Sequence, residues 1–293
     1  MKTTKLFIWI LVLFVPATLF FASCQKDVSG NKNKVPAGKQ SVIILMNDDP
    51  ATYQKVLIDI QLVEVKIDTG VSRHEDSYYD RDDDNDDDHH GHDSYGQWDT
   101  LNVKPGVYDL LTLRNGIDTI LATGFPAIGR ISKIRITLGA NSILWTDSIH
   151  NFPLTICENK PYVYVKAASH AIDTLPTGEV LLRIDFNVNK SIKLKNGGYC
   201  LKPEIKAYSD HSTGSVEGKL FPKEVKALVS VFSASDTAYA IPDKEGKYKI
   251  KGLKEGMYTV FIDATQPYLD STISNVAVYR GKETKMAAIT LRK

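Results

Sequence analysis

The chain has no excess of charge of either sign, because 36 basic and 35 acidic residues give a formal net charge of +1 over 293 residues. No global field therefore favours nucleic acid as a partner, and any electrostatic function must be local. Helix-length amphipathic patterns are scarce. A serine nucleophile elbow, an HExxH helix and a phosphate-binding glycine loop are missing too. We therefore predict that this protein is not an enzyme and binds no nucleic acid.

Cysteine is also scarce, with three residues in the whole chain. If Cys24 is modified as described below, Cys157 and Cys200 remain as an even pair in an oxidising compartment. A disulfide and two separately buried thiols agree about equally with the sequence, since pairing requires Cα atoms within about 7 Å. Nucleophilic chemistry is the least favoured interpretation, because neither cysteine has a nearby histidine in the sequence.

The N-terminus has the pattern of an export signal. Lys2 and Lys5 form a short positive region, and the apolar run 6–21 follows without a charge. The run ends at Phe21-Ala22-Ser23-Cys24, which resembles the lipobox that is cleaved before a cysteine that is then acylated, although bacterial lipoboxes usually carry Leu in place of Phe21. The alternative is an uncleaved membrane anchor, but the run falls short of the roughly 20 residues that a spanning helix needs.

These residues predict a lipoprotein signal peptide over 1–23, a palmitate-bearing anchor on Cys24 and a flexible tether over 24–40. Gln25-Lys26-Asp27 resembles the short polar tract that sends some lipoproteins to the outer leaflet. We expect a lipid-anchored protein of the outer membrane, on its periplasmic or its surface-exposed face.

Strand patterns dominate the rest of the chain. Val56, Ile58, Ile60 and Leu62 alternate with polar residues, and the apolar positions then change parity after Leu62, as a β-bulge would produce. We predict an all-β fold class, with two β-sandwich domains in tandem. The domains are 41–209, of unknown character, and 214–293, a smaller sandwich of about seven strands, with a polar linker between them.

An Asp/His-rich tract interrupts the first domain, within a stretch, 72–97, that we interpret as a long hairpin loop. Its candidate metal ligands are Asp82, Asp84, Asp86, Asp88, His89, His90 and His92. The aspartates have the spacing of calcium loops, but the turn glycine and the bidentate Glu are missing, so a tight site is not expected. The histidines suit zinc, copper or nickel. Weak calcium or zinc binding is one hypothesis, and a solvated acidic loop is the other.

Several motifs occur in the order of a known family. They are Met46-Asn47-Asp48-Asp49-Pro50, the segment 108–116, the segment 133–139, the segment 185–192 and Tyr199-Cys200-Leu201-Lys202-Pro203. Together they cover most of residues 41–208 and resemble the domain of unknown function 4382 of secreted and lipid-anchored bacterial proteins. That family has no established activity, so the resemblance implies a fold and no catalytic residues.

The second domain opens with Gly214-Ser215-Val216-Glu217-Gly218, and the segments 243–253 and 256–260 supply its central pattern. These residues resemble carboxypeptidase regulatory-like, or transthyretin-like, modules. The resemblance implies a prealbumin-like sandwich that serves as a spacer, a stability element or a carbohydrate-binding surface. Alternation also predicts that Tyr248 and Tyr258 point inward.

We therefore expect a non-catalytic envelope lipoprotein that acts as a binding or accessory module, held at the membrane by its lipid anchor. Its partner would be a glycan or an outer-membrane protein. Exposed aromatic residues such as Trp98 or Trp145 would stack on sugars. Three aromatic residues exposed in one plane would favour glycan binding, whereas their burial would favour a structural or protein-partner role. One alternative is a metal-binding envelope protein that uses the Asp/His-rich tract.

A less favoured alternative is an enzyme with an unrecognised site. It would need a deep pocket in the first domain, lined by Asp48, Asp185 and a histidine. We expect instead that Asp48 caps a turn before Pro50, and that Asp185 lies on a solvent face, opposite Ile184 and Phe186.

Overall fold

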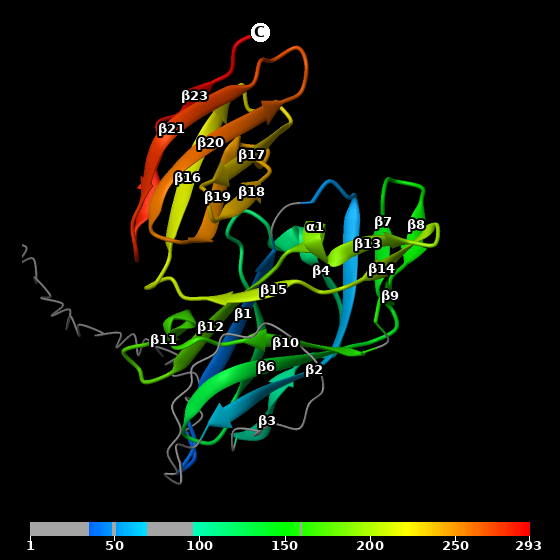
Figure 1. The fold of residues 1–293 in the computed structure, drawn as a ribbon, viewed down its shortest axis with the longest axis vertical. Helices are drawn as coiled ribbons and strands as arrows, with labels where there is room; N and C mark the ends of the chain where they lie inside the picture. Colours follow the sequence, from blue (N-terminus) through cyan, green and yellow to red (C-terminus); the bar gives the residue numbers. More distant parts are fainter. Residues whose placement is uncertain (1–34, 49–50, 69–95, 159) are drawn as a thin grey trace, which may run out of the picture. The chain divides into compact units, whose positions relative to one another are not determined.

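The computed structural model describes residues 35–48, 51–68, 96–158 and 160–293, and their regular structure consists almost entirely of β-strands (Figure 1). This confirms the predicted all-β fold class. The signal peptide, Cys24 and the Asp/His-rich tract lie outside the described residues. Within the described ranges, no helix has the length and apolar character needed to cross a membrane.

A twelve-stranded sheet forms most of the first part of the described chain. Its strands are β1 (Val42–Asp48), β2 (Lys55–Asp68), β3 (Gly96–Val103), β4 (Gly106–Asp109), β5 (Thr119–Gly124), β6 (Arg130–Leu138), β7 (Ile143–Trp145), β8 (Asn151–Pro153), β10 (Tyr162–Lys166), β11 (Ile172–Thr174), β12 (Val180–Phe186) and β15 (Ile205–Tyr208). The main path runs β10-β6-β2-β3-β5-β1-β12-β11, and β4, β7, β8 and β15 pair off it. Three short helices accompany the sheet: η1 (Leu110–Leu113), η2 (Ser169–Ala171) and α1 (Val188–Ser191).

The longest strand, β2, lies between β6 and β3 and pairs antiparallel with both. Its register with β6 shifts between Ile60 and Leu62, where the apolar residues change parity in the sequence. The bulge predicted there is confirmed. It lets Val63 and Val65 stay buried after the shift.

One apolar core lies on the inner face of the large sheet, and both halves of the strand path contribute to it. β2 and β6 supply Val63, Val65, Ile134 and Ile136, while β1 and β12 supply Val42, Ile44, Met46, Leu182 and Ile184. β1 is central to this arrangement because it pairs antiparallel with β5 and parallel with β12.

A smaller sheet has the order β13-β14-β9. Its strands are β9 (Thr155–Ile156), β13 (Ile192–Lys195) and β14 (Gly198–Leu201). Asn196 and Gly197 join β13 to β14, with positive φ angles of 52° and 76°. Two left-handed residues match the type I′ turn of a two-residue hairpin, which explains why Asn-Gly stands here.

Residues 214–293 form two four-stranded sheets with a separate apolar core. One sheet contains β16 (Gly214–Phe221), β19 (Lys247–Leu253), β22 (Glu283–Lys285) and β23 (Ile289–Thr290), and the other contains β17 (Ala227–Phe232), β18 (Thr237–Ala240), β20 (Gly256–Ala264) and β21 (Ser271–Val278). Tyr248 and Tyr258 are buried in this core, as alternation predicted. Gly218 makes room for Tyr248, because a Cβ at position 218 would lie 2.3 Å from the phenol oxygen.

The polar stretch before β16 is held by the first region, and is not a free tether. The Asp173 carboxylate accepts hydrogen bonds from the buried hydroxyl of Ser209 and from the backbone N–H of Asp210, and it lies 2.9 Å from Nδ1 of His211. Arg183 Nη2 lies 2.9 Å from the Asp210 carboxylate. The linker thereby gains a fixed path.

A second connection runs through Asp118. Its carboxylate lies 3.5 Å from Nε of Arg183 in β12 and 3.0 Å from Nζ of Lys251 in β19. Nearby, Asn115 donates from Nδ2 to the carbonyl of Ile241 at 2.7 Å. All three charged side chains of this connection are less than one-fifth exposed, so solvent screens it less than a surface ion pair.

Candidate functional site

Two sets of candidate residues lie outside the described part of the chain: the lipidation site Cys24, and all seven candidate metal ligands between Asp82 and His92. Their roles stay predictions. In the ranges that the structure does describe, no group of three or more His, Cys, Asp or Glu side chains could hold a metal ion.

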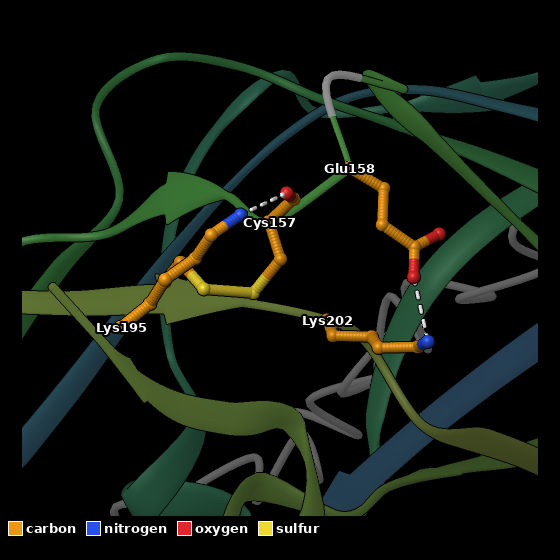
Figure 2. Close-up of a disulfide and its surroundings, with 5 residues drawn as sticks. Cys157, Glu158, Lys195 and Lys202 are labelled. Carbon is orange, nitrogen blue, oxygen red and sulfur yellow. Dashed lines mark hydrogen bonds and ion pairs between the residues drawn. A yellow bond between two sulfur atoms is a disulfide. The ribbon is translucent and has the colours of Figure 1, made fainter.

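Cys157 and Cys200 are joined by a disulfide, with their Cα atoms 5.1 Å apart (Figure 2). The bond links the end of β9 to β14. Lys195 donates to the carbonyl of Cys157 at 3.2 Å, and Lys202 lies 2.6 Å from the carboxylate of Glu158. The disulfide thus joins β9 to β14 in the small sheet, and these two lysine contacts flank it.

The histidines outside the acidic tract lie apart from one another. His150 contacts Asp147 in an exposed turn, His170 is exposed on η2, and His211 contacts Asp173 beside the linker. An enzyme was expected to need a pocket lined by Asp48, Asp185 and a histidine; the groove that Asp185 lines contains neither Asp48 nor a histidine.

The expectation that Asp185 lies on a solvent face was wrong, whereas the turn that Asp48 was expected to cap includes residues 49–50, which lie outside the described part of the chain. Asp48 is buried at the end of β1 and accepts from the backbone N–H of Val188 at 3.3 Å. Asp185 is only 4% exposed, although it points away from Ile184. That face is not solvated here, since Lys206 of β15 flanks Asp185 and residues 233–237 face it across a groove.

An aromatic row lies on the outer face of the large sheet, opposite the core. It consists of Trp98 on β3 and of Tyr162 and Tyr164 on β10. The ring centroids are 5.9 Å apart for Trp98 and Tyr164, and 5.3 Å apart for Tyr162 and Tyr164. Tyr164 is 49% exposed and Tyr162 is 38% exposed. The rings are tilted by 33° and 56°, so the row is curved and is not a single flat plane.

Arg135 of β6 holds the aromatic row in place. Its guanidinium carbon lies 4.5 Å from the Trp98 ring centroid, a cation–π distance. The same guanidinium makes two 2.6 Å hydrogen bonds to Glu64 of β2, and these bonds raise the pKa of Arg135 above its ordinary value. A two-bond fork fixes the guanidinium plane, so Trp98 packs on a rigid support.

A polar groove of about 580 Å³ adjoins Tyr164. Its lining residues are Tyr164, Asp185, Asn187, Lys190, Pro203, Glu204, Ile205, Lys206 and the segment 233–237. The volume falls in the range of small-ligand sites, but the wall is more polar than in most of them. Because Tyr164 belongs to both features, the aromatic row and the groove form one continuous candidate site.

Burial is the main cause that raises the pKa of Asp185 above its ordinary value, and the nearby Asp236 carboxylate adds to it. Lys206, whose Nζ lies 3.6 Å from Oδ2, and Lys190 act in the opposite direction. The other oxygen, Oδ1, has no hydrogen-bond partner among the described residues. The groove wall therefore includes a buried carboxylate whose Oδ1 has neither contact with solvent nor a hydrogen-bond donor among the described residues.

Sequence reasoning identified Trp98 and missed Tyr162 and Tyr164. Trp145, the other candidate, ends β7 and is half-buried away from the row. The alternation Tyr162-Val163-Tyr164-Val165 was the available signal, since it places both tyrosines on one face and both valines on the other. Only the sheet order shows that β3 brings Trp98 to the same face.

A family model described as domain of unknown function (DUF4382) matches residues 39–203. No curated protein matches the chain.

Solved structures give only weak likenesses. A type II cohesin–X-dockerin interface mutant from Acetivibrio cellulolyticus is 26% identical in sequence, with a TM-score of 0.22. The match covers 27% of this chain and 56% of that chain. The Bacillus anthracis TIE protein is 12% identical over 87% of this chain and 34% of that one, with a TM-score of 0.21. A mutant shaft pilin SpaA from Lactobacillus rhamnosus GG is 11% identical over 86% and 98%, with a TM-score of 0.21. No functional inference follows from these values.

Proposed function

Because the chain belongs to the DUF4382 family, whose description names no activity, we propose its function from the site itself: a non-catalytic envelope lipoprotein that binds glycans. The observation that carries the proposal is the aromatic row of Trp98, Tyr162 and Tyr164 at the mouth of a polar groove. The proposal places the protein in the outer membrane, anchored through Cys24.

Sugar rings have apolar C–H faces and a rim of hydroxyl groups. Aromatic rings stack on the faces, and carboxylate, amide and hydroxyl groups bond the rim. The aromatic row offers the first kind of contact and the groove offers the second. Two basic side chains accompany the row: Arg135 lies over the Trp98 ring, and Nζ of Lys133 lies 6.0 Å from the Tyr164 ring centroid.

The proposal also takes residues 214–293 as a carboxypeptidase regulatory-like module, on the strength of two facing four-stranded sheets and an inward Tyr248. Its neighbour in the chain contributes the aromatic row. Asp118 joins the two regions through its ion pairs with Arg183 and Lys251.

A glycan-array screen of the mature protein tests this function. We expect saturable binding to a defined saccharide, and about tenfold or greater loss of affinity, equivalent to about 1.4 kcal/mol, in Tyr164→Ala and Trp98→Ala. Tyr279→Ala is the matched control, because Tyr279 is 52% exposed and lies on the second module. Equal affinity in all variants would refute the aromatic row as the binding surface.

Tryptophan fluorescence gives a direct readout of contact. The mature chain has two tryptophans, since Trp9 belongs to the predicted signal peptide. In Trp145→Phe, Trp98 is the single fluorophore, and its emission should shift when a saccharide stacks on the row. An unchanged spectrum at saturating saccharide would place binding elsewhere.

A further inference from the structure

One of the residues that line the groove beside Tyr164 is almost fully buried. Asp185 is 4% exposed, and its Oδ1 has no hydrogen-bond partner among the described residues. Leaving a buried charged acceptor without a donor is unfavourable by roughly 1–3 kcal/mol or more. Oδ1 is also closed off from solvent, so a bound molecule would meet the Asp185 carboxylate from the groove side, where this residue forms part of the wall.

The wall beside Asp185 is rigid in the absence of any ligand. Asn187 caps α1 by accepting from the N–H of Lys190 at 2.9 Å, and its own N–H donates to the carbonyl of Glu204 at 3.0 Å. Ser191 ties the same two segments together, since its hydroxyl donates to the Asn187 carbonyl and accepts from the N–H of Glu204. The groove is therefore preorganised, which lowers the entropic cost of binding.

The opposite wall comes from the second module. It is the turn Ser233–Thr237 between β17 and β18, which contains three hydroxyl side chains. The Ser233 hydroxyl accepts from the N–H groups of Ser235 and Asp236, so this turn is also fixed. Asp236 is also held, since its Oδ2 accepts from the backbone N–H of Lys254 at 3.3 Å and lies 3.2 Å from the Tyr258 hydroxyl. The groove consequently takes residues from both parts of the chain.

The charges of the groove select among ligands. Three carboxylates, those of Asp185, Glu204 and Asp236, line it together with the ammonium groups of Lys190 and Lys206. The Lys206 ammonium forms an ion pair with Asp185, which partly neutralises its charge. An anionic ligand would meet an excess of like charge, whereas a ligand rich in hydroxyl or ammonium donors would find acceptors at fixed positions.

From these contacts we infer that the groove holds one end of a neutral or amine-bearing saccharide, with the carboxylates of Asp185 and Asp236 as acceptors and the Ser233–Thr237 turn as the facing wall. The inference rests on the proposed glycan-binding function and deepens it. It makes the second module a part of the binding site, where the sequence resemblance alone also allowed a spacer. Because Tyr164 lines the groove and belongs to the aromatic row, a saccharide bound in the groove would extend over the row.

The test is a glycan array that carries neutral, amine-bearing and carboxylate-bearing saccharides, probed with the full mature protein and its variants. We expect wild type to bind neutral or amine-bearing saccharides. Asp185→Asn should weaken binding by about tenfold, with the larger loss for amines, and Ser235→Ala should weaken it severalfold. Asp263→Asn, an exposed carboxylate on β20, is the matched control and should bind like wild type.

The outcomes separate the two proposals. If Tyr164→Ala loses binding while Asp185→Asn and Ser235→Ala keep it, the aromatic row binds glycans and the groove inference is overturned. Preference of wild type for carboxylate-bearing saccharides would also overturn it. If wild type binds no saccharide on the array, the glycan function fails and the groove inference fails with it. A cooperative unfolding transition of Asp185→Asn in urea shows that the variant is folded before denaturant is added.

Discussion

Replacing Asp185 with Asn should stabilise the protein at neutral pH. The carboxylate is 4% exposed, its Oδ1 lacks a partner among the described residues, and burial raises its pKa. Asn has nearly the same shape and no charge to desolvate. Lys206 loses an ion partner, but its side chain is 45% exposed and stays hydrated, so that loss is worth at most about 1 kcal/mol.

The pH dependence of the effect has a definite sign. The folded pKa of Asp185 is raised above its ordinary 3.8, so the folded state retains its proton at pH values where the unfolded chain has released it. Stability then falls as pH rises from 3.8 through the folded pKa. Asp185→Asn removes this fall. Wild type and variant should be equally stable near pH 3, and the variant should be more stable at pH 7 by about 1–3 kcal/mol.

Urea denaturation at pH 3 and at pH 7 measures the two free energies of unfolding, with Asp263→Asn as a control for loss of an exposed carboxylate. Thermal scans should show a rise of about 2–4 °C per kcal/mol for Asp185→Asn at pH 7. A variant that is less stable at pH 7, or a difference that is the same at both pH values, would show that Asp185 is satisfied in the native state.

Three further changes test other parts of the molecule. Cys24→Ser should release the protein from membranes, because the acyl chains supply about 0.8 kcal/mol per buried CH₂; a variant that stays with membranes after a high-salt wash contradicts the lipid anchor. Removal of residues 74–94 should abolish any zinc or calcium heat in calorimetry while folding is retained, and equal heats with and without the tract would rule out the metal hypothesis. Asp118→Ala leaves Arg183 and Lys251 without their shared carboxylate, so limited proteolysis should cut the linker 209–214 several times faster than in wild type, and an unchanged rate would show that the Asp118 connection does not hold the two regions.

Alternation in the sequence predicted which side chains face the cores. Val63 and Val65 of β2 and Tyr248 of β19 are buried as expected, because a half-buried strand repeats every two residues whatever its neighbours. Alternation failed at Asp185, where the second face of β12 is also covered. That face is covered by β15 and by the turn 233–237, which are distant from β12 in sequence. No local pattern around Asp185 could therefore indicate its burial.

The candidate site was visible only in part for the same reason. Trp98 could be identified as a candidate because it is an aromatic residue near the start of a strand. Its spatial neighbours Tyr164 and Arg135 lie on strands that are distant from it in the sequence. Alternation specifies a face and gives no order of strands in the sheet. The disulfide likewise depends on β9 lying beside β14, which two cysteines in a sequence leave undecided.

The parallel pairing of β1 with β12 has a consequence for how the chain folds. Val42 pairs with Val180 and Asp48 pairs with Phe186, so β1 cannot complete its hydrogen bonds until most of the first region has been synthesised. Non-local pairing of this kind slows folding, because the closure of a long loop comes before the contacts that reward it. Until then, the edge of β1 that pairs with β12 is open. The apolar side chains of Val42, Ile44 and Met46 also lack the part of the core that β12 supplies. The unfolded chain is thus most prone to aggregate before β12 pairs with β1, and a chaperone that holds extended apolar segments would act on β1.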